Sequence, residues 1–247
     1  MKRLYNNWLT RLLFFIGGIF SLRLVSTFMH MTTLDKLYKP RSFRKSSHLE
    51  ISPEIVEKLP RYCQTIFGAK MDPINLMFVG TEAGIKRAFE KAGWHGVHPS
   101  SPVHVLLGFF SSLFNRTYNK GPFMPLFISV GLQDIGFQKV TKGYSQRHHI
   151  RVWRTKHQLP GDNRLWVAAA TFEKSFKVGI RPPFIFHHME PNLDIERDYI
   201  VEELIQQGHL LVNHYRLNDT ITKRKPRKNP HGDRFYTDGM ASAVEIV

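Results

Sequence analysis

Apolar and polar positions alternate along this chain with two different periods, one typical of helices and one typical of strands. A continuous apolar run at 74–80 ends in glycine, and residues 81–94 follow with apolar positions at helical spacing. This pattern predicts a strand, a turn and a helix. A second apolar stripe at 192–208 predicts another helix, which ends at its last glycine.

Short apolar runs separated by glycine, proline and asparagine predict most of the remaining elements as strands. These predicted strands are residues 125–130, 134–140, 148–154, 164–172, 184–189 and 209–217. The stretch 101–114 is apolar nearly all round and predicts a helix that is either buried in the protein or lies against a membrane. The order of elements indicates an α+β fold, with a single domain whose mainly antiparallel central sheet is flanked by helices.

Residues 1–31 combine a basic start with an uncharged apolar run at 12–22, which predicts a membrane anchor or a signal-like segment. A spanning helix would have to continue through Arg23, because eleven helical residues reach about 17 Å across a hydrocarbon layer of roughly 30 Å. A cleaved secretory signal is the alternative, although no A-x-A-like cleavage site follows the run. Residues 32–71 are interpreted as a basic linker carrying one short helix, and residues 72–247 as the main domain.

Charge narrows the choice of partners. Lys and Arg outnumber Asp and Glu by 35 to 20, a net charge of +15 that favours anionic partners. The basic run KRKPRK at 223–228 is read as a solvated loop, and no nucleic-acid partner is expected because no recognised nucleic-acid motif or aromatic interleaving accompanies it.

The single cysteine, Cys63, excludes an intrachain disulfide framework and is expected in the linker helix. Basic residues flank the apolar run on both sides, so orientation stays open, with export of the domain preferred.

The candidate site residues lie around two pairs of adjacent histidines, each of which has arginines close by in the sequence. In the predicted strand RHHIRVW, alternation places His148 with the apolar Ile150 and Val152, and His149 with Arg151 on the opposite face. A second doublet ends the strand FIFHHM, and the helix after it carries a guanidinium within its apolar stripe.

That guanidinium belongs to Arg197, and an unpaired arginine there would be too costly to bury. We therefore expect a carboxylate partner or a bound anion, with Asp134, Asp194 and Asp238 as the first candidates. Asp194 also stands where a helix N-cap belongs. Histidines of both doublets with a carboxylate could hold a divalent metal, but no specific motif supports one, so the cofactor is left unknown.

Six blocks occur in order: DPINLMFVGTEAGIKRAFEKAGW, PLFISVGLQDIGFQK, RHHIRVW, LWVAAATF, HHMEPNLDIERDYIVEEL and NPHGDRFYTDG. Together they resemble the LssY C-terminal domain family, over roughly residues 72–240. In larger bacterial proteins such domains follow DedA-like membrane segments or type-2 phosphatidic acid phosphatase domains. The resemblance therefore implies work on envelope lipids or their phosphates, and a location in the bacterial cell envelope. Neither companion is seen in this sequence, so phosphatase activity is not carried over.

The polar positions in these blocks supply our candidate site residues. The candidates for acid/base or electrostatic chemistry are His148, His149, Arg151, His188, Asp194 and Arg197. The candidates for ligand contact are Gln133, Asp134, Trp153, Glu196, Tyr236 and Asp238. His187 and the basic loop are less tied to the family pattern.

Three functions remain open from the sequence. The first is a membrane-anchored envelope accessory domain that binds an anionic, phosphate-bearing lipid or carrier through the His/Arg/Asp cluster. The second is a hydrolase acting on a phosphoester-type substrate by histidine acid/base or metal-assisted chemistry. The third is a non-catalytic interaction domain whose polar network is purely structural.

Overall fold

The computed structural model describes residues 49–97, 119–121, 125–129, 131–142, 146–159, 162–178, 185–230 and 232–247, together with Gly18 and Leu107. All of these except Gly18 belong to one compact unit, Phe43–Val247. The predicted anchor at 1–31 and the predicted helix at 101–114 lie outside the described residues, apart from those two single positions.

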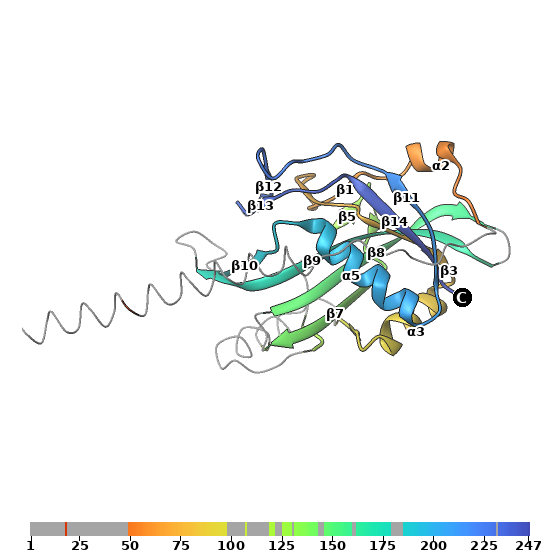
Figure 1. Cartoon of the computed structure of the whole chain (residues 1–247), viewed down its shortest axis with the longest axis horizontal. Helices are drawn as coiled ribbons and strands as arrows, with labels where there is room; N and C mark the ends of the chain where they lie inside the picture. The colour runs from red at the N-terminus through yellow and green to blue at the C-terminus, as the bar shows by residue number, and fades with distance from the viewer. Residues whose placement is uncertain are drawn as a thin grey trace, which may run out of the picture. The chain divides into compact units, whose positions relative to one another are not determined.

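An eight-stranded sheet forms the centre of this unit, in the order β11-β14-β3-β9-β8-β7-β4, with β10 also paired to β9 (Figure 1). Its strands are β3 Leu76–Gly80, β4 His95–Gly96, β7 Ile135–Lys142, β8 Gln146–Gln158, β9 Arg164–Val178, β10 Ile185–Met189, β11 Leu210–Arg216 and β14 Met240–Glu245. Neighbouring strands run antiparallel except β14 and β3, which are parallel. The α+β fold with a mainly antiparallel sheet is therefore confirmed.

Two helices, α3 Glu82–Lys91 and α5 Leu193–Gln206, pack on one face of this sheet (Figure 1). The start of α3 is stabilised by Thr81, whose side chain accepts a hydrogen bond from Gly84 N. Gly93 and Gly208 follow the two helices with φ of +79° and +99°, the left-handed conformation that ends a helix at little cost in glycine. The helices predicted at 81–94 and 192–208 are confirmed, and so is the predicted end of the second at Gly208.

The other face of the sheet is covered by helix α2 and a small four-stranded sheet in the order β2-β1-β5-β6. These elements are α2 Pro53–Glu57, β1 Tyr62–Gln64, β2 Lys70–Pro73, β5 Phe127–Ile128 and β6 Gly131–Leu132. The segment interpreted as a linker thus contributes the predicted short helix and, in addition, two strands.

Cys63 lies in β1 and is fully buried, so its expected place in a linker helix was wrong. Burial also raises the pKa of the Cys63 thiol, which keeps the thiol protonated and unreactive. The residue is a small apolar filler in a second core, which lies between the small and the large sheet and also contains Met71, Trp153 and Val167. The first core lies between the large sheet and the helices α3 and α5.

A third, smaller core lies at the start of α5, next to the short paired strands β12 Arg227–Lys228 and β13 Arg234–Phe235. Met189, Leu193 and Phe235 pack together there. The basic run at 223–228, read as a loop, therefore ends in a short strand.

Candidate functional site

The first histidine doublet is split between the two faces of the sheet. His148 lies on the face covered by the helices, and His149 lies on the face that carries Arg151. This is the alternation predicted for β8, since successive side chains of a strand point to opposite sides. The two imidazoles therefore belong to two different environments.

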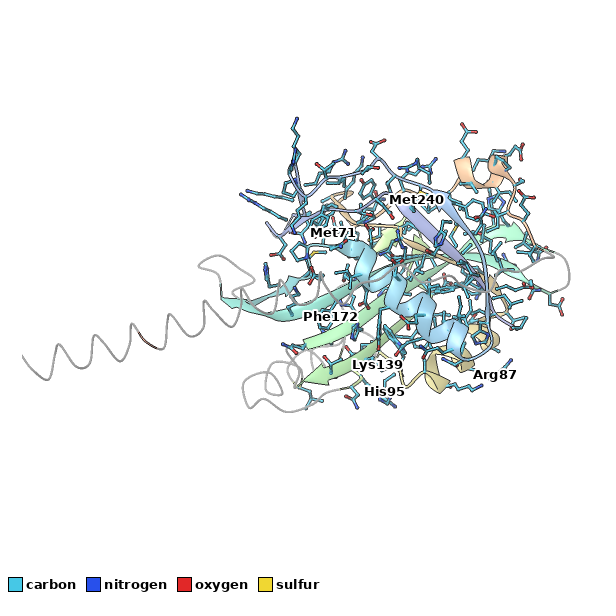
Figure 2. The ribbon with its side chains drawn as sticks, in the orientation of Figure 1. Met71, Arg87, His95, Lys139, Phe172 and Met240 are labelled. Atoms are coloured by element: carbon cyan, nitrogen blue, oxygen red, sulfur yellow. The ribbon has the colours of Figure 1, made fainter. Side chains whose placement is uncertain are left out.

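On the helix side, His148 meets the first turns of α5. Its Nδ1 lies 2.7 Å from Glu196 Oε2, and its ring stacks on Tyr199 with centroids 4.3 Å apart. Glu196 is fully buried, and this burial raises the pKa of its carboxyl group while the charge of His148 opposes the rise. Figure 2 shows Phe172, whose ring centroid lies 4.5 Å from that of His148, beside α5.

One turn further along α5, Glu203 collects three donors. Its carboxylate accepts from Trp94 Nε1 at 2.7 Å, from Tyr199 Oη at 2.6 Å and from Lys139 Nζ at 2.5 Å. Lys139 also donates to Ala92 O, so α3, α5 and β7 are joined by one group of polar contacts. The spacing of 199 and 203 on one helix face is visible in the sequence, but the partners from other elements are not.

On the opposite face, two ion-pair groups follow one another along β8 and β9. Glu173 lies 2.5 Å from Arg147 Nε and 3.3 Å from His149 Nδ1. His149 Nε2 lies 2.7 Å from the hydroxyl of Thr171, which follows Ala170 on β9.

Further toward the middle of that face, Arg151 Nη1 lies 3.7 Å from Asp72 Oδ2. Both side chains are about nine-tenths buried. This pair lies in the interior, as the Glu173 group does. It also joins the small sheet to the large one, because Asp72 belongs to β2 and Arg151 to β8.

Arg197 is surrounded by three carboxylates at the start of α5. Its guanidinium lies 2.7 Å from Asp238, 2.7 Å from Asp198 and 3.5 Å from Asp194, and its side chain is 6% exposed. The expected carboxylate partners are thus present in Asp194 and Asp238. Asp134 instead accepts a hydrogen bond from the backbone N of Arg154.

Asp194 does not cap the helix, and that expectation was wrong. Asn192 is the N-cap and accepts from Asp194 N, because the helix begins at Leu193 and Asp194 already lies in its first turn. Asp194 instead accepts from Thr237 Oγ1 at 2.6 Å and from Asp238 N at 2.9 Å. It therefore ties the beginning of α5 to the turn before β14.

Burial raises the pKa values of two aspartates beside Arg197, namely Asp198 and Asp194. For Asp198, burial and the neighbouring charge of Asp238 raise the pKa to about 7. Burial also raises the pKa of Asp194, although its hydrogen bond from Thr237 and the charge of Arg197 oppose the rise.

The remaining candidates lie apart from this group. His188 is 46% exposed and its Nδ1 lies 2.8 Å from Asp233, so it contacts neither His148 nor Arg197 in any described interaction. Gln133 closes a loop by exchanging hydrogen bonds with the backbone of Leu126. Trp153 and Tyr236 pack in the second and third cores. The side chain of His187 lies outside the described part of the chain.

A basic cleft was missed at the sequence level. It has a volume of about 850 Å³ and lies between β1, β2 and the end of β11. Four cationic side chains and one carboxylate contribute to its wall, namely Arg61, Lys70, Arg216, Arg227 and Asp219. These residues come from sequence positions far apart, so no local motif marks them.

The cations of this cleft are mostly bonded to neutral groups. Arg216 donates to Thr220 Oγ1 and to Asp238 O, and Arg227 donates to Tyr62 Oη at 3.0 Å. Asp219 approaches Arg227 to 3.8 Å, but its side chain is 90% exposed, where an ion pair contributes little. The wall therefore keeps an excess of positive charge.

Two further features concern metals and membranes. Within the described ranges, no three His, Cys, Asp or Glu side chains are grouped so that they could hold a metal ion. The helices that the structure describes include none with both the length and the apolarity to cross a bilayer.

Fold and site together define an α+β domain that contains several buried ion pairs in its interior and a basic cleft on its surface. The chain belongs to the LssY C-terminus family, whose model matches residues 56–241. The match includes β1 and β2, and it confirms the resemblance seen in the sequence. No curated protein and no solved structure matches the chain.

Proposed function

We propose that this protein binds an anionic, phosphate-bearing ligand, and that the ligand lies in the basic cleft. The observation that carries the proposal is the charge of the cleft wall, which holds four cationic side chains against one carboxylate. Phosphate oxygens take charge-assisted hydrogen bonds from arginine forks more strongly than neutral acceptors do. The ligand would complete the hydrogen bonding of these cations.

Neutral groups in the same wall suit the rest of such a ligand. Tyr62, Gln64 and Ser129 line the cleft with hydroxyl and amide groups, which can bond to ester or sugar oxygens next to a phosphate. In such a cleft, the cations would provide most of the affinity for an anionic ligand, and the neutral polar groups would distinguish one such ligand from another.

The buried His/Arg/Asp cluster is better understood as part of the scaffold. Arg197 is 6% exposed and is already shared by three aspartates, and His148 is paired with a buried Glu196. A ligand would have to displace these partners and would leave carboxylates buried without a cation, which is costly. The cleft, and not the buried cluster, is therefore the proposed binding site.

The predicted membrane attachment and export to the bacterial cell envelope belong to the same proposal. An exported domain held near a lipid surface would meet phosphate-bearing headgroups and carriers at high local concentration. The chain has 35 basic and 20 acidic residues, and this excess of positive charge supports attraction to such a surface.

The test uses full-length protein in a non-ionic detergent, titrated with glycerol 3-phosphate at low ionic strength in a calorimeter. The Arg216→Gln/Arg227→Gln variant removes two cleft cations, and Arg87→Gln removes an exposed cation from α3, on another part of the molecule (Figure 2). We expect the first variant to bind about tenfold more weakly or worse, because each charge-assisted bond contributes roughly 1.5–3 kcal/mol. Arg87→Gln should bind as the wild type does. Equal affinity in all three proteins would refute the proposal.

A further inference from the structure

The turn between β1 and β2 exposes two large apolar side chains next to each other. Ile66 is 73% exposed and Phe67 is 94% exposed. Single exposed apolar residues are common on protein surfaces, but two large adjacent ones at the tip of a hairpin form a contiguous apolar surface, which is typical of an interaction site.

The tip is held in shape by its own hydrogen bonds. Gly68 N donates to Thr65 O, Thr65 N donates to Ala69 O, and Ala69 N donates to Thr65 Oγ1. Gly68 has φ of +80°, a conformation that glycine adopts without strain. The two apolar side chains are therefore presented on an ordered turn and have no described core residue to cover them.

The same hairpin forms part of the basic cleft. Tyr62 and Gln64 of β1 and Lys70 of β2 all line it, and Lys70 Nζ lies 5.6 Å from the centre of the Tyr62 ring. An apolar tip and a cationic wall thus stand within a few residues of one another on two short paired strands.

We propose that the β1–β2 tip inserts Ile66 and Phe67 into the interfacial region of an anionic lipid bilayer, so that the basic cleft takes the phosphate of a lipid headgroup. The inference rests on the proposed function and deepens it, since it assigns the phosphate to a membrane lipid and not to a soluble compound. Apolar side chains enter the headgroup and acyl boundary while flanking cations are attracted by anionic lipids.

A bilayer fits this surface better than a protein partner does. The apolar part consists of two side chains at one tip, whereas a stable protein interface buries at least about 1,000 Å² with good complementarity. Exposed cations also continue beyond the cleft wall, because Arg224, Lys225 and Lys228 lie in the same segment as the lining Arg227 and are exposed. A small apolar wedge on the same hairpin that lines a basic cleft complements an anionic membrane.

The test places an environment-sensitive fluorophore at the tip of the full-length protein. Phe67→Cys is labelled with nitrobenzoxadiazole and reconstituted into vesicles of phosphatidylcholine alone or mixed with phosphatidylglycerol, each with or without a nitroxide on the lipid acyl chain. The native Cys63 is fully buried and does not compete for the label. Gln206→Cys is the matched control, because Gln206 is exposed on α5, which packs on the other face of the sheet.

We expect the label at position 67 to be quenched by the nitroxide at least twofold more in vesicles that contain phosphatidylglycerol, and the label at position 206 to be unaffected. Adding Arg216→Gln and Arg227→Gln should reduce the quenching at position 67. A label at position 67 that is not quenched in either vesicle, or is quenched equally in both, would overturn the inference. Lipid-independent self-quenching would overturn it too, since it would assign the tip to a second copy of the chain.

The two proposals can fail separately. If glycerol 3-phosphate binds in a manner that depends on Arg216 and Arg227 but the tip label is not quenched, the cleft takes a soluble phosphate and the membrane inference is wrong. If glycerol 3-phosphate binding ignores both arginines, the proposed function is wrong whatever the label reports.

Discussion

Replacing Arg197 with methionine removes the cation that Asp194, Asp198 and Asp238 share at the start of α5. Methionine keeps a long, flexible, apolar side chain, so the change is mainly one of charge and hydrogen bonding. Removing one partner of a buried ion pair typically costs about 3–5 kcal/mol, because the other partner remains in the interior without compensation. We expect a loss of that size in the free energy of unfolding above about pH 8.

The loss should depend on pH, and its sign follows from the raised pKa of Asp198. That pKa is about 7 in the folded protein and near its ordinary 3.8 in the unfolded chain. Between those values the folded state binds more protons, so stability falls as pH rises, by at most about 1.4 kcal/mol per pH unit for one group. Without Arg197 the neighbouring acids should also take up protons more readily. The variant should therefore lose clearly less stability near pH 5 than near pH 8.

The assay is urea unfolding of the full-length protein in a non-ionic detergent, followed by the fluorescence of the buried Trp94, Trp153 and Trp166. Arg154→Met is the matched control, since this arginine pairs with Glu82 at an exposed position where ion pairs contribute about 1 kcal/mol or less. A loss for the Arg197 variant that is no larger than the control's, or that stays constant from acid to alkaline pH, would refute the reasoning.

Three other changes test single features of the scaffold. Gly239→Ala should lower stability by more than about 2 kcal/mol in urea unfolding, because φ is +81° and the new Cβ would meet Asn218 O at 2.2 Å; an unchanged midpoint would contradict this. Glu196→Leu should cost about 2 kcal/mol, and adding His148→Phe should recover most of it, since apolar residues then replace both members of a buried pair; additive losses in the double-mutant cycle would argue against the coupling. Asp198→Asn should flatten the decline in wild-type stability between pH 5 and pH 8, and an identical decline in both proteins would show that another group titrates there.

Elements with a strong local signal were predictable from the sequence. The stripe of α5 and the alternation in β8 follow from residues close together in the chain, and both appear in the structure as expected. The face on which His148 lies was predictable for the same reason, because period-two alternation fixes it once the strand is known.

Elements that depend on distant partners were not predictable in the same way. Strand β14 pairs in parallel with β3, more than 160 positions earlier, and its short alanine-rich segment carries little strand signal of its own. Strands β1 and β2 were hidden in a polar segment that becomes half-buried only when it packs on the large sheet. The N-cap of α5 was misplaced by two residues, since Asn192 and Asp194 both suit that role and only the fold decides.

The candidate site shows the same limit more sharply. A sequence reveals that ionisable residues are present and which face of an element each shares, but the depth of each group below the surface depends on the layers above it. Here the helices and the small sheet bury the histidine and arginine groups, and the cost of burying charge then demands partners such as Glu196 and Asp194. Cations left in the cleft have no such constraint, because water still reaches them. The ionisable groups most noticeable in the sequence are therefore buried and paired with one another in the fold. The less noticeable basic residues of the cleft stay available to a ligand.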